Sequence, residues 1–152
     1  MSVPTKTAFS PRWTHWAIHT HDLDATVSFY REYCGLQISH ERIAGDDNHR
    51  VVWMAEPGRE KDWVVVLIPN GPKRNRLDND YSHVGFAVSS REEVNRIAER
   101  ARTEGLLLWE PRQESFPVGY YCGVRSPDGT CVEFSYGQPL GPGADPFEEE
   151  TE

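Results

Sequence analysis

The sequence predicts an α+β fold made of two copies of one module, in which a strand and a helix precede three further strands. The first observation is a repeat: residues 13–36 and 81–106 both read as a strand carrying a histidine, then a helix, then a glycine. The second is that His15 and His83 occupy matching places, 68 residues apart. The third is that three strand-like segments follow each helix. Such a repeat is typical of a duplicated supersecondary unit, whose pseudo-twofold axis would bring the two histidines together.

The first module is expected to span residues 13–68. The side chains of its first strand alternate between the two faces of the sheet, so His15 points to the opposite face from its neighbours in sequence. The helix begins after Asp22 or Asp24, because either carboxylate can accept hydrogen bonds from the free N–H groups of the first turn. Gly35 ends the helix. The three further strands are predicted at 36–43, 49–55 and 63–68, with turns at 45–48 and 56–59.

A polar linker at residues 69–80 precedes the second module, residues 81–137. Ser90 and Glu93 form the sequence of a capping box at the start of its helix. Gly105 ends that helix. The strands of this module are predicted at 81–88, 106–110, 119–125 and 130–136, with an irregular loop at 111–118 and a tight turn at 126–129.

The ends and the overall charge limit the possible functions. Residues 1–12 are expected to be a loose arm, and residues 138–152 an acidic, disordered tail. The net charge of −8 lacks the basic footprint of a nucleic-acid-binding protein. No apolar run approaches the roughly 18 residues that span a bilayer, and the N-terminus lacks the apolar stretch of a signal peptide. We therefore expect a cytoplasmic protein with no membrane or nucleic-acid partner.

Three residues form a candidate metal site. Glu133 lies within an otherwise apolar strand segment, where an unpaired ionised carboxylate costs several kcal/mol. A metal ion would pair with it, and His15 and His83 would supply two nitrogen ligands. Two histidines and one carboxylate form a facial triad that leaves about three coordination positions open. Such a site suits a substrate that chelates through two oxygens. The competing interpretation is that each is an ordinary strand residue without a metal.

Candidates for acid–base chemistry are fewer. Tyr120 and Tyr121 precede the last hairpin, and one of them is expected to face the cavity, where a phenol could hydrogen-bond a bound oxygen or act as an acid. His49, at the start of a hairpin strand, could reach the mouth of the cavity. Arg125 is a possible contact for an anion. For each of these residues a role in packing or at the surface is the alternative.

These features together resemble the vicinal oxygen chelate superfamily, which contains glyoxalase I, methylmalonyl-CoA epimerase, fosfomycin and bleomycin resistance proteins, and extradiol dioxygenases. The resemblance covers residues 13–137. It rests on His15 with the helix that follows to Gly35, on the strand from His83, and on the turn 126–130 leading to Glu133. It implies two βαβββ modules whose sheets curl into a half-open barrel around a metal, often within a homodimer. It assigns the metal ligands to His15, His83 and Glu133.

The sequence also departs from that family. Glyoxalase I and the epimerase use a fourth ligand, a glutamate or glutamine on the last strand of module one, and residues 63–68 offer none. Extradiol dioxygenases place a histidine before the second ligand, which is absent here, and a tyrosine before the glutamate. The place of that tyrosine falls at Gly123, with Tyr121 two residues earlier on the same strand face. His49 or Tyr121 is therefore the expected catalytic substitute.

The function implied by the resemblance is that of a metal-dependent enzyme acting on a small molecule with adjacent oxygens. Fe(II) is favoured, with Mn(II), Ni(II) or Zn(II) as other possibilities. The three-ligand pattern favours oxygenation like that of the extradiol dioxygenases. The alternatives are lyase, isomerase or thiol-transferase chemistry at the same site, and a non-catalytic ligand-binding protein of the bleomycin-resistance type. A homodimer is expected from the resemblance alone.

Overall fold

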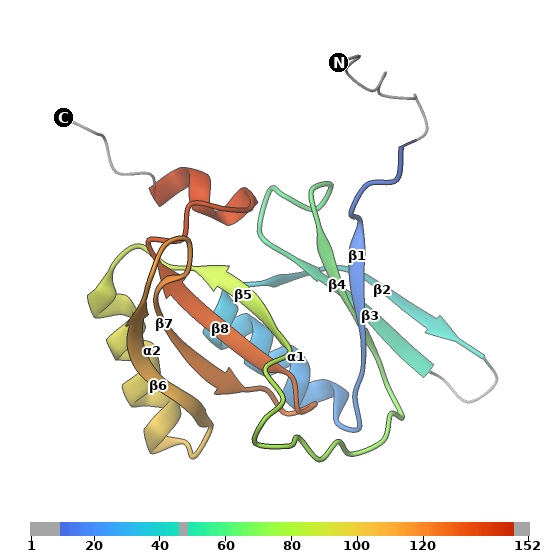
Figure 1. Cartoon of the computed structure of the whole chain (residues 1–152). Coiled ribbons are helices and arrows are strands. Elements are labelled where there is room, and N and C mark those ends of the chain that lie inside the picture. The colour runs from blue at the N-terminus through green and yellow to red at the C-terminus, as the bar shows by residue number, and fades with distance from the viewer. Residues whose placement is uncertain (1–9, 46–48, 148–152) are drawn as a thin grey trace.

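The computed structural model describes residues 10–45 and 49–147. The first module forms a four-stranded sheet in the order β1-β4-β3-β2 (Figure 1). Its β1 runs parallel to β4, and the other neighbouring strands are antiparallel. The helix α1 (Leu23–Cys34) follows β1 in sequence. The strands of this sheet are β1 (His15–His19), β2 (Gln37–Ala44), β3 (His49–Ala55) and β4 (Val64–Ile68).

The second module repeats this arrangement. Its sheet has the order β5-β8-β7-β6, again with the first and last strands of the module parallel and the others antiparallel. The helix α2 (Arg91–Thr103) follows β5. The strands are β5 (His83–Ala87), β6 (Leu107–Glu114), β7 (Gly119–Arg125) and β8 (Cys131–Tyr136). The predicted α+β fold with two βαβββ modules is confirmed.

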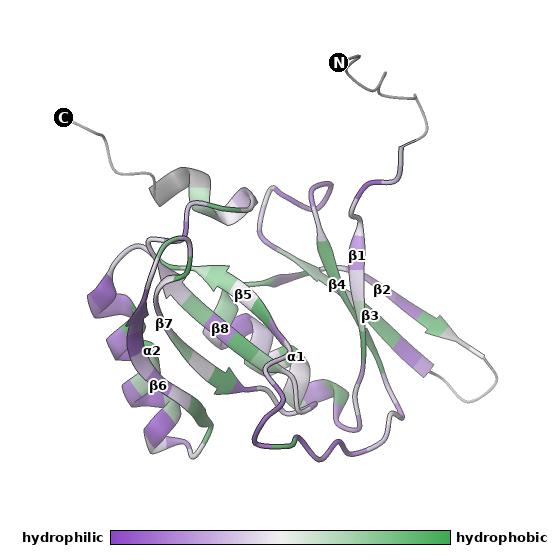
Figure 2. Cartoon of the chain, in the orientation of Figure 1, coloured by the Kyte–Doolittle hydropathy of each residue, from purple (hydrophilic) through white to green (hydrophobic). Residues whose placement is uncertain are grey.

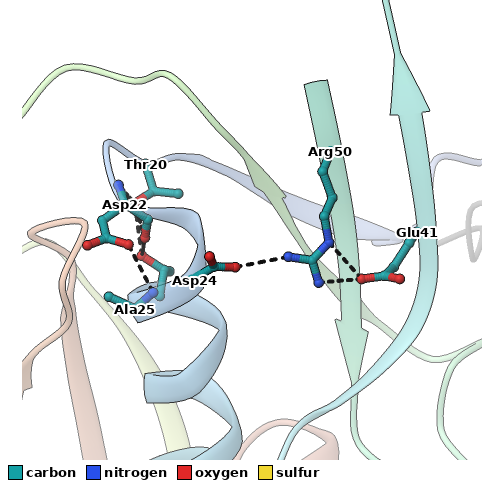
Figure 3. Close-up of polar contacts among 7 residues, drawn as sticks. Thr20, Asp22, Asp24, Ala25, Glu41 and Arg50 are labelled. Carbon is teal, nitrogen blue, oxygen red and sulfur yellow. Dashed lines mark hydrogen bonds and ion pairs between the residues drawn. The ribbon is translucent and has the colours of Figure 1, made fainter. Parts of the chain in front are cut away.

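Local sequence signals fix both ends of α1. The Asp22 carboxylate accepts a hydrogen bond from the Ala25 backbone N–H at 3.0 Å, which makes Asp22 rather than Asp24 the N-cap. Asp24 instead pairs with Arg50 of β3, which also reaches Glu41 of β2, so the guanidinium joins the helix to the sheet (Figure 3). Gly35 ends the helix with a left-handed φ of 68°.

The N-cap of α2 forms only half of the predicted capping box. The Ser90 hydroxyl accepts a hydrogen bond from the Glu93 backbone N–H at 3.1 Å. The Glu93 side chain, however, pairs with Arg96 one turn further along the helix. A carboxylate gains more from a guanidinium than from a neutral backbone donor, which accounts for this choice.

One hydrophobic core joins the two modules. It contains residues of both sheets and both helices, including Ile18, Tyr30, Ile97 and Phe134. The helix α1 contributes to both sides: it lies against β4, and the Tyr33 ring lies 6.3 Å from the ring of Phe134 on β8. Figure 2 shows hydrophobic residues along β4 and hydrophilic residues over much of α2, as expected for a buried strand and a surface helix. Neither module buries its apolar residues by itself.

The structure corrects one predicted loop. Residues 111–114 continue β6 as a strand, although we expected them to belong to an irregular loop at 111–118. Arg112, Gln113 and Glu114 pair with residues of β7 across the sheet. The register shifts between Trp109 and Arg112, which leaves the intervening proline outside the regular ladder, where its missing N–H costs little.

A disordered tail was expected at 138–152, but its described part, residues 138–147, contains a helix, and residues 148–152 lie outside the described part of the chain. Residues Pro142–Phe147 form a 3-10 helix, η1, which lies against β5. Ala144 within it is buried. Of the turn expected at 45–48, Gly45 has the left-handed φ of 80° that the turn requires, and residues 46–48 lie outside the described part of the chain. No helix among the described residues is long and apolar enough to cross a membrane.

Candidate functional site

The parallel pair β5 and β8 positions the second-module residues of the candidate site. Register places Gly85 directly opposite Glu133, and His83 opposite Cys131. Val84 and Phe86, which alternate with these positions on β5, pack against the shared core. His83 and Glu133 therefore lie on the face of the sheet that is turned away from the core. A methyl group at Gly85 would lie 3.5 Å from a Glu133 carboxylate oxygen, an ordinary contact distance, so Gly85 lies directly beside that carboxylate.

His83 and Glu133 approach each other closely. The Nε2 atom of His83 lies 3.7 Å from Oε1 of Glu133. The other ring nitrogen, Nδ1, lies 2.7 Å from the backbone carbonyl oxygen of Tyr81, which can only accept a hydrogen bond. Nδ1 must therefore carry the proton, and in the neutral ring Nε2 has a lone pair next to the carboxylate. This is the arrangement that a histidine metal ligand requires.

The carboxylate of Glu133 is buried, with 8% of its side chain exposed. Burial raises the pKa of Glu133 above its ordinary value, and the neighbouring His83 opposes part of that rise. Within the described part of the chain, His83 is its only ion-pair partner. A buried carboxylate with a single histidine as its ion-pair partner in the described residues fits a site that accepts a cation.

A cavity of about 470 Å³ opens over this pair. The Tyr121 side chain lines it, whereas Tyr120 on the other face of β7 hydrogen-bonds Asn95 of α2. Of the two tyrosines that the sequence left open, Tyr121 thus faces the site. Burial raises the pKa of Tyr121, so its phenol remains protonated at neutral pH. The residues lining the cavity are Tyr81, His83, Trp109, Arg112, Glu114, Val118, Tyr121, Glu133 and Gln138.

Trp109 is a site residue that the sequence did not reveal. Its indole covers Gly123, where a methyl group would lie 2.5 Å from the ring. It also meets His83 edge to face, with ring centroids 5.5 Å apart. The place where extradiol dioxygenases were expected to carry a tyrosine is therefore filled by an indole from the neighbouring strand. No local signal identifies this contact, because it depends on the shifted register between β6 and β7.

Arg76 in the linker holds the backbone segment that precedes His83. Its guanidinium donates to the backbone carbonyl oxygen of Ser82 at 2.9 Å and to that of Asp80, and it lies 5.8 Å from the Trp109 ring. These bonds fix the segment whose Tyr81 carbonyl holds the proton of His83. The sequence did not indicate this role of Arg76, because residues 69–80 carry only the signals of a polar connector.

The remaining predicted site residues lie elsewhere in the single chain. His15 is exposed on β1 of the first sheet, with Nδ1 2.8 Å from the Thr14 hydroxyl. His49 lines a different cavity of about 430 Å³ together with His21, Asp22 and Arg50. In the part of the chain that the structure describes, no three His, Cys, Asp or Glu side chains lie close enough to share a metal ion. The structure therefore brings His83, Glu133 and Tyr121 together, but neither His15 nor His49 joins them.

Comparison with known proteins identifies the family. The chain matches the Glyoxalase/Bleomycin resistance protein/Dioxygenase superfamily over residues 12–134 and belongs to it. It is 52% identical over 136 residues to the uncharacterized protein PA2024 of Pseudomonas aeruginosa, an alignment that covers 90% of this chain and 96% of that protein. The resemblance inferred from the sequence is confirmed.

More distant relatives have named activities. A lactoylglutathione lyase of Arabidopsis thaliana is 25% identical over 138 residues, covering 90% of this chain but 47% of the lyase, so the chain spans about half the length of that relative. The structure of the fosfomycin resistance protein FosX from Listeria monocytogenes matches with a TM-score of 0.64 at 18% identity, covering 85% of this chain and 94% of that chain. A mutant of FosX was solved with Mn(II) and 1S,2S-dihydroxypropylphosphonic acid. At this identity the likeness to FosX shows a common fold.

Proposed function

We propose that this protein is a divalent-metal-dependent enzyme that binds its substrate through two adjacent oxygens at the His83–Glu133 pair. The observation that carries the proposal is the buried carboxylate of Glu133 beside the free lone pair of His83 Nε2. A divalent cation accepts an imidazole nitrogen and a carboxylate oxygen together, and its charge would offset the cost of burying Glu133. Superfamily membership and the Mn(II) complex of FosX support this choice.

A second copy of the chain would supply the third ligand, His15. On β1, Ile18 belongs to the shared core, and His15 lies on the opposite, exposed face. On β5, His83 likewise lies on the face turned away from that core. Because both sheets use their inner faces to build one core, their outer faces cannot meet within one chain. A homodimer in which the first sheet of each chain covers the second sheet of the other would form a composite site from His15 of one chain with His83 and Glu133 of its partner.

The residues around the pair have separable tasks in this proposal. The phenol of Tyr121, whose pKa is raised further by burial, would donate a hydrogen bond to a substrate oxygen that gains negative charge. Trp109 excludes water from the Gly123 side of the site. The bound cation would supply Lewis-acid stabilisation of that oxygen. His49 has no task in this proposal, because it lines a different cavity.

Lyase, isomerase or transferase chemistry is the reaction class best supported. Gly123 lies under Trp109, so the position where the extradiol dioxygenases carry a tyrosine offers no phenol here, and Tyr121 lies two residues away from it. The lactoylglutathione lyase relative also favours chemistry without net oxidation. Oxygenation with Fe(II) is the second candidate, because a three-ligand site leaves room for dioxygen beside a chelated substrate. Fe(II), Mn(II), Ni(II) and Zn(II) are the cations to compare.

The first test is elemental analysis of protein purified without added metal, and again after reconstitution with each of the four cations. We expect near-stoichiometric metal in the wild type and loss of that metal in His83→Ala and in His15→Ala. Iron would direct the search to oxygen uptake, and another metal to isomerase, lyase and transferase assays. A wild type that takes up none of these cations contradicts the proposal.

Mixing the two variants tests the composite site. His15→Ala and His83→Ala chains, unfolded and refolded together in equal amounts, would form mixed dimers in which one of the two sites is intact. Random pairing then restores about one quarter of the wild-type metal content. Each variant refolded alone provides the control and should remain empty. If both ligands came from the same chain, the mixture would hold no more metal than the separate variants.

A further inference from the structure

Arg112 borders the cavity that contains His83 and Glu133. Among the described residues, five other arginines pair with acidic side chains: Arg50, Arg59, Arg96, Arg100 and Arg102. Arg112 forms no ion pair with any residue in the described ranges 10–45 and 49–147, although Glu114 lines the same cavity. Its guanidinium instead lies over the Tyr121 ring, 5.5 Å from the ring centroid. An unneutralised cation therefore borders the cavity that contains His83 and Glu133.

Aromatic rings form the wall of the cavity next to this cation. The Trp109 ring lies 6.3 Å from that of Tyr121 and 6.1 Å from that of Tyr81. The guanidinium of Arg76 also lies near Trp109, 5.8 Å from the ring centroid. The hydrogen bonds that Arg76 donates go to backbone carbonyl oxygens, which carry no net charge. The wall thus combines flat apolar surface with positive charge, a combination that favours a planar or apolar group carrying a negative charge.

We propose that the substrate is a small organic anion whose carboxylate binds Arg112 while its adjacent oxygens face His83 and Glu133. The assignment of the adjacent oxygens rests on the proposed metal site, but the recognition of the carboxylate by Arg112 does not. A guanidinium offers two parallel N–H donors that match a carboxylate. The flat part of the molecule would lie against Trp109 and Tyr121.

Arg91 provides a matched control. It lies over the ring of Tyr120, the neighbour of Tyr121, with its Cζ 4.0 Å from the ring centroid. Tyr120 points to the opposite face of β7, and Arg91 also donates to the side-chain oxygen of Gln113. The two arginines thus make similar contacts with adjacent tyrosines, and only Arg112 borders the cavity.

The experiment compares two probes that share one chelating group and differ by one carboxylate, catechol and 3,4-dihydroxybenzoate. Binding to Zn(II)-loaded and to metal-free protein is measured by titration calorimetry for wild type, Arg112→Met, Arg112→Lys and Arg91→Met. We expect wild type to prefer the carboxylated probe. Arg112→Met should lower the affinity for the carboxylated probe by about 10-fold or more and change the affinity for catechol by less than about twofold. The affinity of Arg112→Lys for the carboxylated probe should lie between those of wild type and Arg112→Met, and the affinity of Arg91→Met should match that of wild type.

The outcomes separate this inference from the proposed function. Equal affinities of the two probes, or an Arg112→Met variant that keeps the preference, would overturn the role of Arg112 even if the protein binds metal. If the protein cannot take up Zn(II) but still prefers the carboxylated probe in an Arg112-dependent way, recognition of the anion is supported and the proposed metal site is contradicted. Failure of wild type to bind either probe also overturns the inference. Thermal unfolding of each variant confirms that it is folded.

Discussion

The two modules share one backbone plan but differ at the positions where chemistry is expected. In module two, Gly85 of β5 lies opposite Glu133 of β8. The matching pair in module one is Ala17 of β1 opposite Val66 of β4. The same point of the sheet therefore carries a buried carboxylate in one copy and a buried valine in the other. A duplicated fold can keep its stability in both copies while only one of them carries the cost of a buried charge.

The two outer strands of each sheet, β2 with β3 and β6 with β7, place their large aromatic side chain on different strands. In module one Trp53 of β3 pairs with His40 of β2, and the rings meet edge to face 5.3 Å apart. In module two the large side chain lies on the other strand of the pair: Trp109 of β6 covers Gly123 of β7. Moving the large ring to the outer strand leaves space beside Glu133. The two modules thus share one fold but distribute the volume of their large side chains differently across the corresponding strands.

The largest expected effect concerns the carboxylate itself. Glu133→Gln should lower metal affinity by at least about 100-fold, because it removes a direct anionic ligand. Val66→Ala, the change at the matching position of module one, should leave metal binding unaltered and cost about 2 kcal/mol of stability. Metal titration and chemical denaturation of both variants check this contrast. Wild-type metal affinity in Glu133→Gln would show that the two positions do not differ in the way proposed.

The second prediction concerns the space beneath Trp109. Gly123→Ala should destabilise the protein by about 1–3 kcal/mol, because the new methyl group would lie 2.5 Å from the indole. In a Trp109→Ala background the same change should cost much less, so a double-mutant cycle by urea denaturation should reveal strong coupling. Gly85→Ala is the control, since its methyl group meets only Glu133, at an ordinary 3.5 Å. Equal costs for the two glycine replacements would contradict this account of the packing.

The smallest expected effect concerns the polar tie between the modules. The Tyr33 hydroxyl of α1 donates to Glu104 after α2 at 2.6 Å, and this bond, with Arg100, holds the pKa of Glu104 below its ordinary value of 4.5. A carboxylate with a lowered folded-state pKa stabilises the protein above its ordinary pKa, and this stabilisation is lost as the pH falls through the folded-state value. Because Glu104 is largely exposed, Glu104→Gln should cost less than about 1 kcal/mol at pH 7 and nothing at pH 2. Denaturation at the two pH values checks this, and an equal cost at both would rule out the ionic origin.

The sequence predicted the modules because their strands and helices carry local signals. Asp22, Ser90, Gly35 and Gly105 mark the helix ends, and alternating apolar residues mark most strands. The extension of β6 carried no such signal. Residues 111–114 are polar and begin with a proline, and only their pairing with β7 makes them a strand. Pairing between distant segments is not encoded in local periodicity.

The candidate site was predictable in part. The repeat indicated His83, and the apolar surroundings of Glu133 indicated a buried carboxylate, and the structure brings these two together. The separation of His15 from them was not predictable, because alternation tells which residues share a face but not which face meets the shared core. Trp109 and Arg112 were missed for a related reason. Their position over β7 follows from two register shifts in β6.

The linker determines more than the distance between modules. Arg76 donates hydrogen bonds to the carbonyl groups of Asp80 and Ser82, and the Tyr81 carbonyl between them accepts a hydrogen bond from Nδ1–H of His83. The linker thus helps to determine which ring nitrogen of His83 carries the proton. Two modules produced as separate polypeptides, cut within residues 69–80, could regain their sheets and their common core without regaining that pattern. Insertions in this segment would accordingly alter how His83 presents its lone pair while leaving the fold intact.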